Sequence, residues 1–352
     1  MTTLLVRFSS FGDVFQCMVA AQALRDSGRR VLWLVRSDFA ELLNRQGFVD
    51  EVIAFDRRQG LWSLLQLSWQ LASRVDEVYD AHANLRSFWV RNCIRLEWLC
   101  RLRWKRWAIT RILVRPKYRW IRLLYLRLGW RSWQLEKRGA VSFLTPLKPW
   151  LGPLTNKRPE YAMPIWRAES AQVPADFATW VRSQARGVVA LAPSAAWPNK
   201  RWPITSWIEL VKELGRIFPG QSFLVLGGPQ DQFAQVLVDE LGPRAFNSLG
   251  RWTLAESAHA LSLCRALIAN DTGFLHVADR LQLPHVAIIG PTAFGFTVSP
   301  KGRTASLRLD CQPCSKDGRD PCRNRETLKC LRDLHAVRVV EIAKSILMEQ
   351  NT

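Results

Sequence analysis

The stretch Leu4-Leu-Val-Arg7-Phe-Ser-Ser-Phe-Gly12-Asp13 combines a short apolar run, a loop with Ser and Gly, and an acid at the start of a helix-forming segment. In that segment Val14, Met18 and Ala21 fall on one face of a helix. The stretch therefore predicts a buried strand, a tight loop and an amphipathic helix. Strands and helices that alternate in this way build parallel sheets.

The alternation continues along most of the chain. Further strands are expected at residues 31–35, 51–55, 77–80, 187–192, 222–226, 266–269 and 285–289. Helices are expected at residues 38–45, 61–73, 205–218, 273–281 and 337–348, and from Thr253, where Glu256 follows at capping-box spacing. Two αβ halves of similar size predict an α/β protein with two facing Rossmann-like domains, each with a parallel sheet, and a ligand cleft at the carboxyl ends of the strands.

Six prolines between residues 140 and 185 mark the connection between the two halves. We therefore expect an N-terminal domain at 1–165, a linker at 166–185, a C-terminal domain at 186–335 and a final helix at 336–352 that packs back across the domains.

The chain of 352 residues carries a formal net charge of +20, and its cations are concentrated in one window. Residues 86–138 contain 16 Lys or Arg, two acids and seven of the 17 Trp. This basic, Trp-rich insertion predicts two or three helices and an anionic partner, which is nucleic acid, an acidic lipid surface or a phosphorylated substrate. Neither a signal peptide nor a membrane-spanning segment is recognisable, so we expect a cytoplasmic protein.

Asp13 is the first candidate for chemistry. A carboxylate at the mouth of a strand–loop–helix unit can accept a proton from a substrate hydroxyl. The alternative is that it caps the helix, because an acid in the first turn binds free backbone N–H groups and interacts favourably with the helix dipole. The glycine spacing of a dinucleotide fingerprint is absent.

The segment Asn270-Asp271-Thr272-Gly273-Phe274-Leu275-His276 is the second candidate, between an expected strand and an expected helix. The helix start suits a diphosphate, Asp271 suits sugar hydroxyls, and His276 lies one turn into the helix. An ordinary strand-to-helix turn is the alternative. The third candidate is the loop at 193–203, in which Lys200 or Arg201 either neutralises a phosphate or lies in solvent.

These segments together resemble glycosyltransferase family 9, the ADP-heptose:lipopolysaccharide heptosyltransferases. The resemblance follows the chain through Gly12-Asp13, Asp80-Ala-His-Ala-Asn84-Leu-Arg86-Ser87, Lys200-Arg201-Trp202-Pro203, Gly227-Gly228-Pro229, Asp271-Thr272-Gly273 with His276, and Gly290-Pro291-Thr292. It implies a GT-B fold and an inverting, metal-independent transfer of heptose from ADP-heptose to the lipopolysaccharide inner core, on an acceptor of the lipid A–Kdo type.

By this resemblance, Asp13 matches the general base that deprotonates the acceptor hydroxyl, and Lys200 matches the lysine that holds the donor diphosphate. The further residues implied in donor binding are Ser194, Asp231, Asp271, Thr272, Gly273 and His276. A transferase that uses no metal stabilises its leaving diphosphate with cations and helix dipoles, so no cofactor is expected for catalysis.

The chain departs from the family at two places. It reads Cys17-Met18-Val19 where a proline is frequent, and it has Ser194 where a glycine is frequent. Ala195 and Ala196 also lack the hydroxyls that some members place on phosphate. These departures leave open a relative that uses another nucleotide-sugar or acceptor, and an inactive protein that binds membrane or nucleic acid.

Under the same resemblance, the basic insertion is expected to meet a phosphorylated lipopolysaccharide acceptor at the inner face of the cytoplasmic membrane, where the protein is peripheral. Nucleic-acid binding is a less favoured interpretation, and ordinary helices with inward Trp and solvated Arg are a third. The expected acceptor and membrane residues are Arg86, Arg91, Arg101, Arg103, Trp104, Lys105, Arg106 and Trp107.

Four cysteines near the C-terminus, Cys311, Cys314, Cys322 and Cys330, are embedded among Lys and Arg. In a cytoplasmic chain, disulfides are disfavoured and four thiols at these spacings suit a structural zinc ion. The alternative is a set of reduced thiols in a compact loop, because only one Cys-x-x-Cys pair is present.

Overall fold

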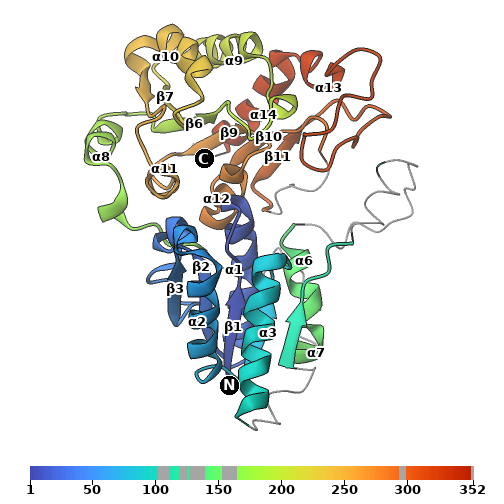
Figure 1. Ribbon diagram of the computed structural model, residues 1–352. Helices are drawn as coiled ribbons and strands as arrows, with labels where there is room; N and C mark the ends of the chain where they lie inside the picture. The colour runs from blue at the N-terminus through green and yellow to red at the C-terminus, as the bar shows by residue number, and fades with distance from the viewer. Residues whose placement is uncertain (102–110, 119–125, 127–138, 153–164, 293–298, 350–352) are drawn as a thin grey trace. The chain divides into compact units, whose positions relative to one another are not determined.

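The computed structural model describes residues 1–101, 111–118, 126, 139–152, 165–292 and 299–349 (Figure 1). Among the described residues the chain forms two compact units: residues 1–101, 111–118 and 139–152 belong to the first, and residues 126, 165–292 and 299–349 to the second. Each unit contains one parallel sheet with helices packed on it, which confirms the predicted α/β class and the two parallel-sheet domains.

The sheet of the first unit has the strand order β3-β2-β1-β4-β5. Its strands are β1 (Thr2–Val6), β2 (Arg30–Arg36), β3 (Glu51–Phe55), β4 (Glu77–Asp80) and β5 (Ile112–Val114). Leu4 lies opposite Leu32 on one neighbour and Val78 on the other, in parallel register. These apolar runs are buried on both faces, as parallel strands covered by helices require.

Three long helices cover this sheet (Figure 1). They are α1 (Phe11–Asp26), α2 (Gly60–Ala72) and α3 (Leu85–Cys100), and the shorter α6 (Val141–Leu144) and α7 (Lys148–Leu151) follow. The helices α2 and α3 pack side by side and share one core with the sheet, through residues such as Leu71 and Ile94. The segment predicted as a helix at 38–45 instead forms two 3₁₀ turns, Ser37–Phe39 and Glu41–Leu43, and the backbone is extended at Asn44, so no α-helix continues through it.

The sheet of the second unit has the order β11-β10-β9-β6-β7-β8. Its strands are β6 (Val188–Ala192), β7 (Ser222–Val225), β8 (Ala245–Asn247), β9 (Ala266–Asn270), β10 (His285–Ile288) and β11 (Gly302–Ala305). The strand β6 lies between β7 and β9, so the chain leaves it on one side and later returns on the other. Such a reversal of strand order opens a crevice at the carboxyl ends of the central strands.

Seven helices of the second unit are described. They are α8 (Ala175–Arg182), α9 (Ile204–Ile217), α10 (Gln235–Leu241), α11 (Leu254–Leu261), α12 (Gly273–Leu281), α13 (Lys329–Arg332) and α14 (Ala336–Met348). Both α9 and α14 pack into one core with the sheet, around Trp207 and Val339. Within the described residues, no helix is long and apolar enough to cross a membrane.

The expected domain borders stay predictions. The stretch at 166–185, expected as a linker, contains α8, and Trp166 donates its backbone N–H to the carbonyl of Arg280 in the same unit at 2.9 Å. The final helix, expected to pack across the domains, contacts α9 and the strands β9, β10 and β11.

The start of α11 shows how directly the sequence sets a helix boundary. The Thr253 hydroxyl accepts the backbone N–H of Glu256 at 3.1 Å, and the Glu256 carboxylate accepts that of Thr253 at 2.7 Å. The predicted capping box is therefore confirmed.

Replacing the cap tests its contribution. We expect Thr253→Ala to lower the free energy of unfolding by about 1 kcal/mol, because it leaves a backbone donor without its partner. Thr205→Ala is the control, since Thr205 is exposed in the first turn of α9, and it should change stability by less than about 0.5 kcal/mol. Urea unfolding measures both, and an equal effect of the two substitutions would contradict the assignment.

Candidate functional site

Asp13 lies in the first turn of α1, directly after the loop that leaves the carboxyl end of β1. Its carboxylate accepts a hydrogen bond from the Ser10 hydroxyl at 2.8 Å and one from the Ser10 backbone N–H at 3.4 Å. The capping interpretation is therefore correct. It does not compete with a chemical role, because 34% of the Asp13 side chain is still exposed.

Arg7 fixes the charge of this carboxylate. It is buried at the end of β1, its Nη2 lies 2.5 Å from Asp13 Oδ2, and its Nη1 donates to the Ala81 carbonyl at 2.8 Å. Burial on its own raises the pKa of Asp13, but the positive charges of Arg7 and Arg115 and the hydrogen bonds from Ser10 outweigh it and lower the pKa from 3.8 to about 2. Asp13 is therefore ionised at neutral pH.

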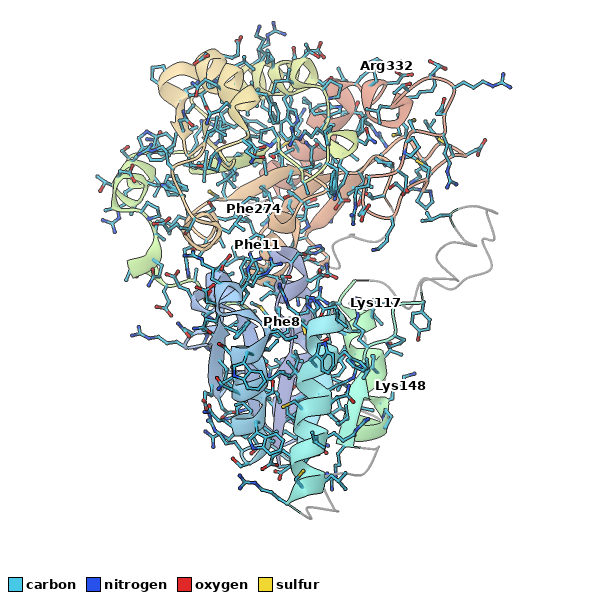
Figure 2. All side chains as sticks on the ribbon, viewed as in Figure 1. Phe8, Phe11, Lys117, Lys148, Phe274 and Arg332 are labelled. Carbon is cyan, nitrogen blue, oxygen red and sulfur yellow. The ribbon has the colours of Figure 1, made fainter. Side chains whose placement is uncertain are left out.

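A cationic and aromatic wall surrounds this pair in the first unit. The Arg115 guanidinium stacks on the Phe143 ring at 3.8 Å and donates to the Ser142 carbonyl at 3.2 Å. His82 lies edge-on to Phe8, which also contacts Phe55. Phe8 is labelled in Figure 2. Burial and the nearby charge of Arg7 lower the pKa of His82 to about 3, so this imidazole is neutral at pH 7. The wall suits an anionic ligand beside Asp13.

The second unit brings Lys200 and Asp271 together. Lys200 ends a 3₁₀ turn after β6, and Asp271 follows β9, so the carboxyl ends of two adjacent strands deliver them. Lys200 Nζ lies 2.9 Å from Asp271 Oδ2, and the same oxygen accepts a hydrogen bond from the Thr292 hydroxyl. Both charged side chains are mostly buried, at 12% and 9% exposure. The pair therefore places a partly neutralised lysine at the edge where phosphate is expected.

The segment 315–320, between the clustered cysteines, packs against Lys200 and its turn. A Cβ added to Gly318 would lie 2.5 Å from Lys200 Cγ, so only glycine permits this close approach. The side-chain amide of Asn199 donates to the Asp320 carbonyl at 3.1 Å, and Thr292 forms a parallel bridge with Ser315. The residues around Gly318 thus hold the Lys200 turn in place.

A pocket of about 420 Å³ opens at the same sheet edge. Its lining comes from the loops after β6, β7 and β9 and from the start of α11, and it consists of Ala192, Ser194, Ala195, Ala196, Arg201, Leu226, Gly227, Gly228, Pro229, Gln230, Asp231, Leu254, Thr272 and Phe274. The start of α12 lies beside Thr272, and the N-terminus of a helix suits an anion. The size and the mixed lining are those of a small-molecule site.

Asp231 supports a turn in this pocket. Its Oδ2 accepts the backbone N–H of Gly228 at 2.8 Å, and its Oδ1 lies 3.6 Å from Arg201 Nη2. Arg201 in turn donates from Nε to the Ala195 carbonyl at 3.1 Å and stacks on the Phe233 ring at 4.8 Å. Both carboxylate oxygens are thus engaged within the protein, and a contact of Asp231 with ribose stays a prediction.

The predicted donor residues therefore form two groups at one sheet edge. Ser194, Asp231 and Thr272 line the pocket, whereas Lys200, Asp271, Gly273 and His276 are not among its lining residues. Gly273 begins α12 and His276 is buried within it. Their proposed roles on the donor are neither confirmed nor contradicted by this geometry.

The predicted acceptor and membrane residues do not all lie in solvent as free cations. Arg91 pairs with the buried Asp80, and Arg101 pairs with the buried Glu97 at 2.7 Å, so both neutralise acids of the fold. Arg86 is exposed. Arg103, Trp104, Lys105, Arg106 and Trp107 lie outside the described residues.

The expected zinc site is not supported by the described geometry. Burial first, and then the neighbouring Cys314, Cys322 and Cys311, raise the pKa of the Cys330 thiol to about 12. The described residues nevertheless include no group of three or more His, Cys, Asp or Glu side chains arranged to hold a metal ion. As placed, the four thiols do not fit a zinc ion, and the zinc stays a prediction.

Sequence reasoning did not identify Arg7, Arg115 and His82 as parts of the site. Arg7 lies inside the first motif, six residues before Asp13. A cation at the end of an apolar strand is the feature of the sequence that indicates its role, and the structure buries it. Arg115 follows the three-residue strand β5, which the basic insertion concealed. The partner of Asp13 was therefore visible in the sequence, whereas Arg115 was not.

Comparison with known proteins shows which family this chain is similar to. Glycosyltransferase family 9 (heptosyltransferase) matches residues 155–327. The chain is 27% identical to lipopolysaccharide heptosyltransferase 1 of Pseudomonas aeruginosa, over 90% of this chain and 86% of that protein. It is 29% identical to lipopolysaccharide heptosyltransferase 2 of Salmonella typhimurium over 48% of this chain. The alignments with this and three other curated heptosyltransferases cover only 37% to 49% of those proteins' lengths.

A solved structure shares the fold. The ADP-heptose lipopolysaccharide heptosyltransferase II of E. coli superimposes with a TM-score of 0.72 at 20% identity, over 100% of both chains. The expected GT-B fold is thereby confirmed.

The Arg7–Asp13 pair makes a testable prediction about charge. We expect Arg7→Gln to raise the pKa of Asp13 from about 2 by about one unit or more, because the main charge that lowers it is removed. With the folded pKa below the ordinary 3.8, the ionised carboxylate stabilises the fold above about pH 4, and this contribution is lost as the pH falls through about 2.

A carboxyl-carbon NMR titration measures this pKa, with Asp13→Asn to assign the resonance. Arg25→Gln is the control, because Arg25 forms a comparable pair with Asp50 at 2.6 Å in the same unit. A pKa that stays near 2 in Arg7→Gln would show that Arg7 does not set the charge of Asp13.

Proposed function

We propose that this chain is a member of glycosyltransferase family 9 and an enzyme that transfers heptose from ADP-heptose to the lipopolysaccharide inner core. The relatives named as lipopolysaccharide heptosyltransferases and the structural relative named for ADP-heptose support this donor and acceptor. The proposed acceptor is of the lipid A–Kdo type, whose phosphates and carboxylates suit the cations of the first unit.

One observation carries the proposal, namely that Asp13 is an ionised carboxylate whose position is fixed by Arg7 and Ser10 and which is still partly open to a ligand. In the proposed reaction Asp13 accepts the proton of an acceptor hydroxyl. The acceptor oxygen forms a bond to the anomeric carbon, and the bond from that carbon to the diphosphate oxygen breaks. The electron pair leaves with ADP, and direct displacement inverts the anomeric configuration.

The low pKa of Asp13 affects the timing of the proton transfer. An alcohol does not give its proton to a carboxylate of pKa about 2 until its oxygen has begun to bond to carbon and has become acidic. We therefore propose that proton transfer is late, and that Asp13 first accepts a hydrogen bond that orients the hydroxyl. Ionisation near pH 2 also keeps the base available throughout the physiological range.

The leaving diphosphate needs positive charge, and the second unit offers two sources of it. Lys200 supplies a cation that moves from Asp271 toward a phosphate oxygen, and the start of α12 supplies backbone N–H groups beside Thr272. In this proposal no metal is needed, because these groups stabilise the charge that develops on ADP. The pocket bordered by Gly227, Gly228 and Asp231 then holds the nucleoside.

The protein is further proposed to work as a peripheral protein at the inner face of the cytoplasmic membrane, where a lipid-linked acceptor is available. The high net charge of +20 favours an anionic surface.

Replacing the base tests the mechanism. We expect Asp13→Asn to lower kcat about 10²- to 10⁴-fold with a folded protein, because the acceptor hydroxyl loses its proton acceptor. The assay follows product mass after incubation of ADP-heptose with lipopolysaccharides truncated at successive core positions. Asp38→Asn is the control, since Asp38 also pairs with an arginine of the first unit, at 2.8 Å, and should retain full activity.

The possible outcomes of this assay separate the claims. Full activity of Asp13→Asn would remove Asp13 as the base. If the wild type binds ADP but transfers no sugar, the proposed donor sugar or the proposed acceptor is wrong. No transfer and no nucleotide binding would reject the enzyme.

Lys200 gives an independent test of the donor site. We expect Lys200→Met to weaken ADP binding about 10- to 100-fold, because a charge-assisted contact to phosphate is lost and Asp271 remains without its cation. Lys212→Met is the matched control, since Lys212 pairs with Glu240 at 3.3 Å on the same unit and should not affect ADP. Isothermal titration calorimetry measures both, and equal affinities would contradict the role of Lys200.

A further inference from the structure

The helices α2 and α3 expose an unusual number of apolar side chains. Between them, eight large apolar residues are more than one-third exposed, and we call this surface the α2–α3 face. It consists of Leu61, Trp62, Trp69, Leu85, Phe88, Trp89, Leu96 and Leu99. The exposed fractions reach 72% for both Trp62 and Leu85. A patch of this kind on one surface indicates an interaction site.

The pattern along α3 shows that this exposure is not a by-product of the core. The buried side of the helix uses Val90, Ile94 and Trp98, whereas Leu85, Phe88, Trp89, Leu96 and Leu99 recur at helical spacing on the exposed side. The helix therefore has two apolar stripes, of which only one is used by the sheet. The same holds for α2, where Leu64 and Leu71 are buried and Trp62 and Trp69 are exposed.

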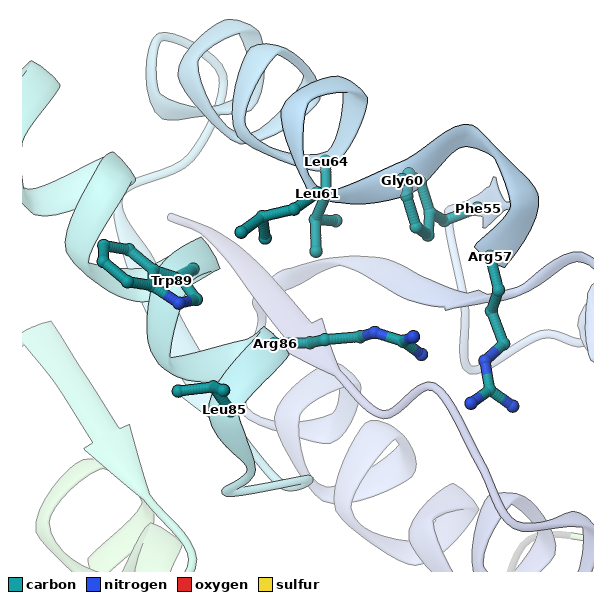
Figure 3. A pocket seen from close by; sticks show the side chains of 8 residues that line it. All are labelled: Phe55, Arg57, Gly60, Leu61, Leu64, Leu85, Arg86 and Trp89. Atoms are coloured by element: carbon teal, nitrogen blue, oxygen red, sulfur yellow. The ribbon is translucent and has the colours of Figure 1, made fainter.

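A pocket of about 220 Å³ joins the two helices on this face (Figure 3). Its apolar lining comes from Phe55, Leu61, Leu64, Leu85 and Trp89. The guanidinium groups of Arg57 and Arg86 belong to the same lining, and Figure 3 shows Arg86 extending from α3 away from Trp89. The pocket thus combines an apolar wall with two cations.

The cations of this face are available for an external anion. Among the described residues, no carboxylate lies within ion-pair distance of Arg57 or Arg86, in contrast to Arg91 in α3 and to Arg101 directly after it. The Arg58 side chain is 93% exposed beside Arg57, and its Nε lies 3.9 Å from Asp56 Oδ1. Aromatic and leucine side chains bordered by such arginines have the composition of an interfacial membrane-binding surface.

We propose that the α2–α3 face docks on an anionic phospholipid surface, with Arg57 and Arg86 on the headgroup phosphates and Trp62, Leu85 and Trp89 among the upper acyl chains. The proposal adds a site outside the catalytic and donor residues, and it does not depend on which sugar is transferred. A second copy of the chain fits less well, because a two-fold contact would gather the same set of arginines from both copies in one interface, where like charges repel.

The test is co-sedimentation of the full chain with vesicles of phosphatidylcholine, with and without phosphatidylglycerol. The test variant is Arg57→Glu/Trp62→Asp, which changes two exposed residues that take no part in catalysis. The matched control is Arg186→Glu/Val337→Asp, with the same change in net charge on exposed residues of the second unit. Thermal unfolding midpoints verify that both variants are folded.

We expect the wild type and the control to bind vesicles that contain phosphatidylglycerol, and to bind phosphatidylcholine more weakly. The partition coefficient of the test variant on these vesicles should fall about tenfold or more, because the variant loses an interfacial tryptophan and reverses a charge. Equal binding by the test and control variants would overturn the proposal. Self-association of the wild type in sedimentation velocity, abolished in the test variant and accompanied by no vesicle binding, would assign the face to a second copy instead.

Transfer to a lipid-free acceptor separates this proposal from the proposed function. We expect the test variant to keep wild-type transfer in that assay while it loses vesicle binding. Absence of transfer by the wild type, with vesicle binding intact and sensitive to Arg57 and Trp62, would contradict the enzyme but leave the docking surface standing.

Discussion

In each unit the first strand lies inside a parallel sheet, with its neighbours on opposite sides, and the chemistry of the protein depends on this constraint. The strand β1 lies between β2 and β4, and β6 lies between β7 and β9. Where the strand order reverses, the loops that follow two adjacent strands run in opposite directions. Their side chains therefore surround a crevice at the carboxyl ends of these strands. Asp13 follows β1, while Lys200 and Asp271 follow β6 and β9.

A second common feature is that the acid in each site forms an ion pair with a cation of the same unit. Arg7 pairs with Asp13 at 2.5 Å, and Lys200 pairs with Asp271 at 2.9 Å. The two pairs differ in what a ligand can do with them. Arg7 is anchored to the Ala81 carbonyl and keeps Asp13 ionised, whereas the flexible stem of Lys200 permits it to exchange Asp271 for a phosphate. One pair therefore sets a base, and the other presents a movable charge.

Much of the fold follows from the sequence because the apolar periodicity is strong. The strands at Glu51–Phe55 and Glu77–Asp80 and the helix at Gly273–Leu281 begin and end where the pattern predicts. The strands β5 and β8 have three residues each, too few to show a period, and β11 reads Gly-Arg-Thr-Ala, without an apolar run. The turns at 37–43 resemble a short helix. The site is less predictable from the sequence, because ion pairs such as Lys200–Asp271 and Arg91–Asp80 form only when the fold brings the two side chains together. Sequence spacing reveals which residue types are present but not which charges neutralise each other.

The central claim is that Asp13 supports a single direct displacement at the anomeric carbon. The most direct measurement is the anomeric configuration of the product by NMR, compared with that of the nucleotide-sugar donor, for transfer catalysed by the wild type. The account predicts the opposite configuration, because the acceptor oxygen attacks from the face away from the leaving diphosphate. A product with the donor's configuration would contradict it, since retention requires a second displacement or attack from the leaving-group side.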